Sequence, residues 1–257
     1  MKLLKRSLVL LGCALAAAAA FTACELELGN NDDRQETNQE TEDGSGITLP
    51  EAFTLTNSEL SGTFAGLQGA FDCFANQSSV TWDTNAKLSW ANPLSGKTNL
   101  EGVTISFMLN NKIGASFDSI LTFFPSTGFD STTWGGVAFT ENGTAHAQGH
   151  GYWDIYLTSD KTSDGLNTIP AETWTRVTYV ITEANVTAYI GNEEFSKITL
   201  TDVDTVTYLT STCDKVAVGV GFCPALWAAG YVDESTYLAD IKIWPSALTA
   251  AQVAAIK

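Results

Sequence analysis

Short runs of alternating apolar and polar residues fill the chain from about Ile47 onward. Glycine, asparagine, aspartate and proline, which favour turns, separate these runs. A period of two places every second side chain of a strand on the same face. No long stretch with the 3.6-residue period of a helix occurs before the C-terminal residues. The pattern therefore predicts an all-β, two-sheet antiparallel sandwich.

We expect strands in nine segments, namely residues 70–74, 103–109, 119–124, 136–140, 152–157, 175–181, 186–190, 215–221 and 237–244. Alternation assigns one face of each strand to the core. In three strands the core-facing sets are Val103, Ile105, Phe107 and Leu109; Val177, Tyr179 and Ile181; and Val216, Val218 and Val220.

One short helix is expected at the C-terminal end. Pro245 ends the last strand, and Thr249 with Gln252 has the spacing of a capping box before the apolar residues 253–256. We expect this helix to pack against the edge of a sheet.

The first 23 residues have the pattern of an export signal. Lys2, Lys5 and Arg6 precede an apolar run, residues 7–20, and small residues lead to Cys24. The run is interrupted by Gly12 and is shorter than the roughly 20 apolar residues of a membrane span. A transmembrane anchor is the alternative.

This segment resembles the signal of bacterial lipoproteins, in which a cysteine is acylated and becomes the new N-terminus. Cys24 is the expected lipidation site. Cys13 also fits the pattern, but cleavage before it would leave too short an apolar core. Plain secretion with cleavage near Ala23 is the other alternative. Acylation would provide the contact with the membrane.

Residues 24–46 are expected to form a disordered acidic tether. Eight carboxylates, one arginine and two leucines follow Cys24 in this segment, which is too little apolar surface to offset chain entropy. An acidic tract behind a lipidated cysteine resembles the surface-export signals of some Gram-negative lipoproteins. We expect a lipid-anchored protein at the bacterial outer membrane or cell surface, with the periplasmic side as the alternative.

Net charge excludes one class of partner. The 257 residues carry a formal charge of -16, and removal of the three basic residues of the signal leaves 10 basic against 29 acidic residues. A nucleic-acid backbone would be repelled. Since no internal repeat occurs, residues 47–257 are expected to form one domain.

Two segments resemble laminin-G-like domains of the concanavalin A-like lectin superfamily. Residues 169–194, with Trp174 and Tyr189, resemble the "W-x-x-V … V-x-x-Y-x-N-G" hairpin, although Gly191 and Asn192 stand in reversed order. Residues 237–253 are similar to the closing "D-x-x-I-Y-x-x-A-L-s-x-x-x-V" strand and helix. The resemblance implies a jelly roll whose concave face and rim loops commonly bind carbohydrate. Some members of the superfamily hydrolyse carbohydrate, and many have no known ligand.

The sequence favours a non-catalytic protein. Hydrolytic relatives need a Glu-x-Asp-x-Glu strand that presents paired carboxylates, and this pattern is absent. The nearest approach, Asp202 and Asp204, is interpreted as turn or edge residues. Serine-hydrolase, phosphate-loop and zinc-protease motifs are also absent.

Aromatic and carboxylate side chains suggest a sugar site. Alternation places Trp153 and Ile155 in the core and leaves the neighbouring positions on the opposite face. The predicted ligand-binding residues are Trp134, His150, Tyr152, Asp154 and Tyr156, with Trp227 at the rim. Core packing is the alternative for each aromatic ring. A metal site of His146 and His150 is disfavoured because we expect the glycine-rich segment around them to be a loop.

The family resemblance also implies a structural Ca²⁺ ion beside the first and last strands. Asp240 occupies the matching position of the closing strand, and Asp72 is a second candidate. A cross-strand hydrogen bond is the alternative role of Asp240.

Three cysteines, Cys73, Cys213 and Cys223, lie in the expected domain. An extended strand from 215 to 221 would hold Cys213 and Cys223 too far apart for a disulfide. Either Cys73 bridges to one of them or no disulfide forms.

The sequence therefore predicts a lipid-anchored, non-catalytic module that binds a glycan or polysaccharide at the bacterial surface. The alternatives are an adhesion or structural module that binds a protein or envelope component, and a divergent glycoside hydrolase. An aromatic groove on the concave face would favour the first, a filled or flat face the second, and two exposed carboxylates about 5 to 10 Å apart the third. The oligomeric state does not follow from the sequence.

Overall fold

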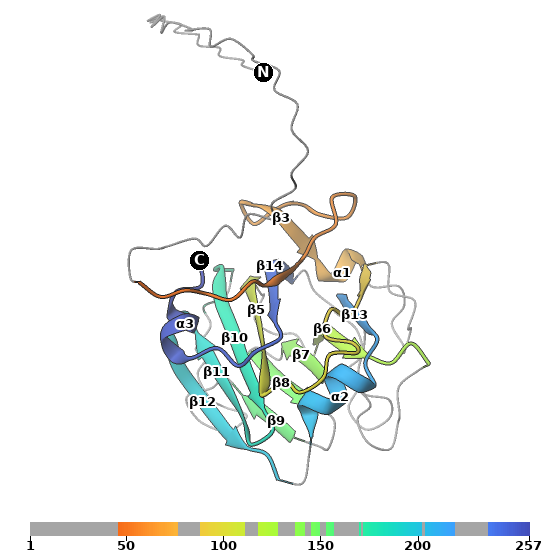
Figure 1. The fold of residues 1–257 in the computed structure, drawn as a ribbon. Helices are drawn as coiled ribbons and strands as arrows, with labels where there is room; N and C mark the ends of the chain where they lie inside the picture. The colour runs from red at the N-terminus through yellow and green to blue at the C-terminus, as the bar shows by residue number, and fades with distance from the viewer. Residues whose placement is uncertain are drawn as a thin grey trace, which may run out of the picture. The chain divides into compact units, whose positions relative to one another are not determined.

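A computed structural model describes residues 46–76, 88–110, 118–127, 137–141, 145–149, 153–156, 170, 172–201, 204–218 and 236–257 (Figure 1). These residues belong to a unit that spans residues 40–257. They form two antiparallel sheets with short helices, which confirms the predicted fold class. No helix in the described ranges is long and apolar enough to cross a membrane.

One sheet has eight strands, in the order β12-β11-β10-β5-β14-β3-β2, with β1 paired to β14. Its members are β1 (Phe53–Leu55), β2 (Gly62–Phe64), β3 (Leu67–Asp72), β5 (Gly102–Asn110), β10 (Thr175–Thr182), β11 (Asn185–Ile190), β12 (Glu193–Thr199) and β14 (Tyr237–Trp244). Strands from both ends of the described chain thus meet in one sheet.

The other sheet has six strands, in the order β4-β13-β6-β7-β8-β9. They are β4 (Ser89–Ala91), β6 (Asp118–Phe124), β7 (Val137–Glu141), β8 (Ala145–Gly149), β9 (Trp153–Tyr156) and β13 (Lys215–Val218). The three helices in the described ranges are α1 (Cys73–Asn76), α2 (Thr205–Ser211) and α3 (Ala250–Ala254).

The main core contains the alternating residues that the sequence assigned to it. Ile105 and Leu109 of β5 are fully buried in one cluster with Leu121 and Phe123 of β6. Tyr179 of β10 is also fully buried there, and its ring lies 6.3 Å from that of Phe107. The period of two therefore identified the inward faces of β5 and β10.

A second cluster covers part of the outer face of the eight-stranded sheet. It contains Val180, Tyr189, Trp244, Leu248, Val253 and Ile256, with Leu49 and Ala52 packed against it. The Trp244 indole N–H donates to the main-chain oxygen of Pro50, at 2.9 Å. The predicted capping box is present, because the Thr249 hydroxyl accepts from the Gln252 N–H and the Gln252 side chain accepts from the Thr249 N–H. Helix α3 lies on the outer face and not, as predicted, against a sheet edge.

Several elements in the described ranges differ from the sequence prediction. Strands β1, β2 and β4 were not predicted, and helix α1 takes the end of the strand expected at residues 70–74. Residues 145–149, expected in a loop, form β8, so His146 lies in a strand. Strand β12 and helix α2 were not predicted. Helix α2 begins after Asp204, whose carboxylate accepts from the Thr207 N–H at 2.8 Å.

Cys73 and Cys213 are both buried in the main core. Burial of Cys213, with a smaller contribution from the carboxylate of Asp214, raises the pKa of this thiol far above its usual value. No disulfide joins Cys73 to Cys213, and Cys223 lies outside the described residues.

Candidate functional site

The register of the six-stranded sheet defines rows of paired residues across neighbouring strands. One row runs from Asp154 in β9 through Gln148, Ala138 and Thr122 to Ala217 in β13. The next row of the same parity pairs Tyr156 with His146. Between these two rows lies the row of Ile155, which leads to Leu121 and Val218 of the main core. The positions of Asp154 and Tyr156 thus alternate with a core row.

On the outer side of the six-stranded sheet, the side chains at the centre, on β6 and β13, are buried. Thr122 and Phe124 of β6 and Ala217 of β13 are fully buried although they alternate with residues of the main core. At the edge strand β4, Ser89 and Ala91 are exposed. A ligand on this side of the sheet would therefore have to bind away from the centre of β6 and β13.

The other predicted contact residues lie outside the described ranges. These are Trp134, His150, Tyr152 and Trp227, as is the lipidation site Cys24. For Asp154 and Tyr156 the structure gives the strand and its register. The predicted sugar site therefore stays a prediction.

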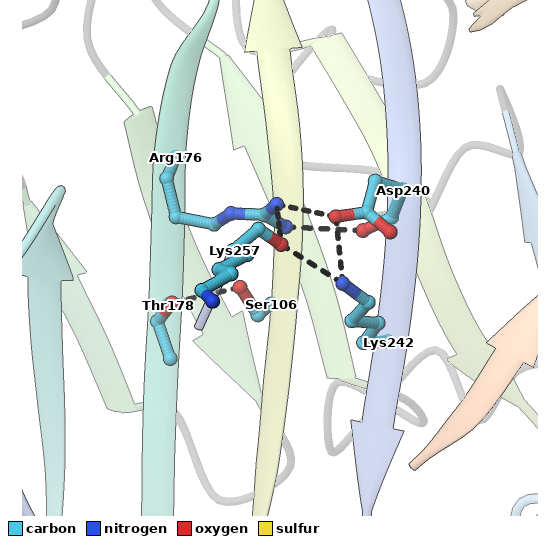
Figure 2. Close-up of polar contacts among 6 residues, drawn as sticks. All are labelled: Ser106, Arg176, Thr178, Asp240, Lys242 and Lys257. Carbon is cyan, nitrogen blue, oxygen red and sulfur yellow. Dashed lines mark hydrogen bonds and ion pairs between the residues drawn. The ribbon is translucent and has the colours of Figure 1, made fainter. Parts of the chain in front are cut away.

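On the eight-stranded sheet, Asp240 lies in a polar network with Arg176 and Lys242 (Figure 2). Arg176 reaches from β10 across β5 to β14, where it forms an ion pair with the Asp240 carboxylate and donates to the Asp240 main-chain oxygen at 3.2 Å. Lys242 Nζ lies 3.0 Å from the same carboxylate oxygen, Oδ2. Both cations also donate to the Lys257 main-chain oxygen, each at 2.9 Å. Beside them the Thr178 hydroxyl donates to Ser106 Oγ, at 2.8 Å.

These contacts bear on the calcium prediction. The cross-strand role that the sequence left open for Asp240 is the one in the structure. Asp72 Oδ1 accepts from the Ala75 N–H at 3.1 Å, at the start of α1. Within the described ranges, no three His, Cys, Asp or Glu side chains lie together as a metal site. A calcium ion at Asp240 stays a prediction and would compete with two cations for Oδ2.

The carboxylates of Asp204 and Asp214 have structural partners. Asp204 caps α2. The Ser126 hydroxyl donates to Asp214 Oδ2 and the Ser126 N–H donates to Oδ1, each at 2.6 Å. These hydrogen bonds hold the pKa of Asp214 below its usual value. A general acid needs the opposite shift, so Asp214 is unsuited to that role.

Three half-buried aromatic residues form a cluster that the sequence analysis did not identify. Phe64 of β2 stacks on Tyr237 of β14, with ring centroids 5.2 Å apart and planes inclined by 11°. The Trp174 indole N–H donates to the main-chain oxygen of Ala65, at 3.0 Å. We call Phe64, Trp174 and Tyr237 the hairpin aromatic cluster, because they gather at the β2–β3 hairpin. The sequence analysis named Trp174 only as part of the hairpin motif and did not count it among the ligand-binding residues. The pairing of β14 with both β5 and β3 was needed to reveal the cluster.

Comparisons with known proteins support the fold. A scan against protein-family models found no match, and neither did a search of curated proteins. The binding domain of botulinum neurotoxin serotype D aligns over 79% of this chain and 45% of its own, with 13% identity and a TM-score of 0.51. The Ruminococcus gnavus sialidase module CBM40, bound to α2,3-sialyllactose, aligns over 61% of this chain and 82% of its own, with 8% identity and a TM-score of 0.47.

A third match is domain 4 of the arabinanase AbnA from Geobacillus stearothermophilus, in complex with arabinotriose. It has 14% identity, a TM-score of 0.42 and coverage of 62% of this chain and 68% of its own. The chain spans less than half the length of the neurotoxin structures it matches. At these identities the neurotoxin match establishes the jelly-roll sandwich fold alone.

Proposed function

We propose that the protein is a non-catalytic carbohydrate-binding module, held at the bacterial surface by acyl chains on Cys24. Residues 25–46 act as the acidic spacer between the lipid and the sandwich. The acyl chains supply the membrane affinity, so the sandwich is free to bind a glycan.

The observation that carries this proposal is the register of β8 and β9. Asp154 and Tyr156 occupy positions that alternate with a core row, next to Gln148 and His146. An aromatic ring can stack on the apolar face of a pyranose, and a carboxylate accepts hydrogen bonds from its hydroxyl groups. The same face of the sandwich would receive Trp134 and Tyr152, as the sequence predicts.

The non-catalytic part of the proposal rests on the carboxylates. Glycoside hydrolysis needs two carboxyl groups on opposite sides of the scissile bond, one of them with a raised pKa. The closest match to the hydrolase pattern in the sequence is Asp202 with Asp204, and the Asp204 carboxylate caps helix α2.

One observation favours a second candidate, an adhesion module for a protein or envelope partner. The filled outer side of β6 and β13, where Thr122, Phe124 and Ala217 are buried, is typical of a surface without a central sugar groove. Sugar binding would then be confined to the edge or to the loops.

A glycan array with the purified protein tests the proposal. We expect binding to at least one glycan, and at least a tenfold loss in Trp134→Ala or Tyr152→Ala, on the order expected for the loss of one stacked ring. Phe53→Ala is the matched control, because Phe53 is an exposed aromatic residue of β1, on the other sheet. Repetition with a chelator tests whether calcium supports the site. Absence of binding to any glycan would contradict the proposal and favour the protein-partner candidate.

A further inference from the structure

The hairpin aromatic cluster lies on the eight-stranded sheet, apart from the site predicted on the six-stranded sheet. Register pairs Tyr237 with Asn110 on one side and with Asp72 on the other. The hairpin between β2 and β3 turns at Ala65 and Gly66, both in the left-handed backbone region. Its tip reaches Trp174 at the start of β10 through the 3.0 Å hydrogen bond to Ala65.

The three residues of the cluster are partly exposed to solvent. Carbon atoms in contact lie about 3.5–4.0 Å apart, so nearly parallel rings with centroids 5.2 Å apart must be offset. Each ring then leaves part of its face uncovered by the other. Phe64, Trp174 and Tyr237 are all half-buried in the folded chain.

The rings are also held in place before any ligand arrives. The mutual stacking of Phe64 and Tyr237 and the indole hydrogen bond of Trp174 restrict all three side chains. A rigid contact surface loses little side-chain entropy on binding. Preorganised rings of this kind suit a rigid ligand with flat apolar faces.

Charge restricts the ligand further. Asp72 is paired directly with Tyr237 across the strands, and the exposed residue Glu172 lies two positions before Trp174 along the chain. Arg176, on the same sheet, already donates to Asp240 and Lys257. The chain as a whole carries a charge of -16. An anionic ligand would be repelled, whereas hydroxyl groups could donate to the carboxylates.

We propose that the hairpin aromatic cluster is a second carbohydrate contact surface, which binds the apolar face of a neutral pyranose. This inference rests on the proposed carbohydrate-binding function and adds a site on the opposite sheet. Two sites on one chain would let the module hold a long or branched polysaccharide at two points, which raises avidity.

Titration calorimetry of the purified protein tests the inference with defined probes. The neutral probes are cello-, xylo- and mannotetraose, and the acidic probe is tetragalacturonate. We expect at least one neutral probe to bind more tightly than the acidic one. Phe64→Ala and Tyr237→Leu should each weaken that binding roughly tenfold. Phe53→Ala, which removes an exposed ring outside the cluster, should leave it unchanged.

The outcomes separate this inference from the proposed function. If Trp134→Ala abolishes binding while both cluster variants bind as tightly as the original chain, the inference is wrong and the proposed function stands. If no glycan binds, both are wrong. If the cluster variants fail to fold, NMR of the unaltered protein provides the test, through the ring resonances of Phe64 and Tyr237. If these resonances do not shift when the sugar binds, the inference is also wrong.

Discussion

Asp240 combines an unusual backbone conformation with two ion pairs of its carboxylate. It lies in a β-bulge of β14 and has a φ of 46°. Aspartate tolerates this left-handed region better than most residues with a Cβ atom. The bulge brings the carboxylate to Arg176 and Lys242, whose side chains are 13% and 24% exposed. Partial burial makes these ion pairs stronger than fully exposed ones.

Substitutions at Asp240 should separate the backbone effect from the charge effect. Asp240→Ala loses the ion pairs and places Ala at positive φ, and we expect it to lower the free energy of unfolding by about 2–3 kcal/mol. Asp240→Gly loses the same ion pairs without the strain and should be about 1 kcal/mol more stable than the alanine variant. Urea denaturation at low and high salt measures both differences. Equal stability of the two variants would show that the backbone conformation carries no cost.

Asp214 should make stability depend on acid pH. Hydrogen bonds from Ser126 lower its folded pKa below the ordinary value of 3.8. A carboxyl group with a depressed folded pKa stabilises the fold above its unfolded pKa, and this contribution is lost as the pH falls through the folded pKa. Because Asp214 is exposed, the effect should be below about 1 kcal/mol.

The measurement is the free energy of unfolding between about pH 5 and pH 2. Ser126→Ala should reduce the loss of stability that comes from Asp214, and Asp214→Asn should remove it. Asp204→Asn, at the cap of α2, is the comparison, because its carboxylate has a different partner, Thr207. An unchanged acid profile in Ser126→Ala would contradict the assigned cause.

At the scale of elements, the sequence predicted those strands whose side chains alternate. β14 was predicted with the bounds it has, and β5 and β10 to within one residue at either end. β8 was missed because Ala145–Gly149 holds no β-branched residue, and its place is set by pairing with β7 and β9. α2 was missed because three threonines and a valine favour a strand locally, whereas Asp204 and the burial of Val206 and Leu209 stabilise a helix. Tertiary pairing and packing decided these elements, so local sequence could not predict them.

The candidate site could be predicted less well. Period two indicated which positions of β9 alternate with the core, but the cross-strand neighbours of Asp154 and Tyr156 depend on register. The hairpin aromatic cluster joins residues 64, 174 and 237, which only the sheet order brings together. The contacts of Asp240 likewise depend on a bulge that no local pattern specifies.

Gly102 marks a close approach between β5, β10 and the segment before α3. A Cβ atom at this position would lie 2.6 Å from the Ile181 main-chain oxygen and 2.8 Å from Ala247 Cβ. Main-chain atoms of a central sheet cannot move aside cheaply. We therefore expect Gly102→Ala to lower the free energy of unfolding by about 1–3 kcal/mol in urea denaturation.

Gly62 of β2 is the matched control. A Cβ atom there would meet the ring of Phe64 at 3.0 Å, and a side chain can turn away. Gly62→Ala should therefore be milder than Gly102→Ala. Adding Ala247→Gly to Gly102→Ala should recover only part of the loss, because the Ile181 oxygen stays in place. Full recovery would show that Ala247 alone determines the cost.

At the scale of the whole molecule, part of the outer face of the eight-stranded sheet is covered by α3 and by Leu49 and Ala52, which lie shortly before β1. The chain therefore enters the sandwich beside this covered area. If Cys24 carries the lipid, the spacer must lead from the membrane to this entry point. Its length and its negative charge would then set the distance between membrane and sandwich.

Lipidation can be tested by substitution of the cysteine that is expected to carry the acyl chain, Cys24. A single acyl chain gives only marginal membrane binding, and stable anchoring takes two signals, such as a second chain. In cells fed a clickable fatty acid, we expect the label on the unaltered protein and on Cys13→Ser, but not on Cys24→Ser. Cys13→Ser is the matched control, because Cys13 lies in the same export segment and also fits the lipoprotein pattern. An uncleaved signal could hold Cys24→Ser at the membrane without acylation, so membrane fractionation cannot distinguish the two cases. The fatty-acid label is therefore the measurement that decides. If Cys24→Ser keeps the label and Cys13→Ser loses it, Cys13 is the lipidated residue, and the proposal that the spacer begins after Cys24 is wrong.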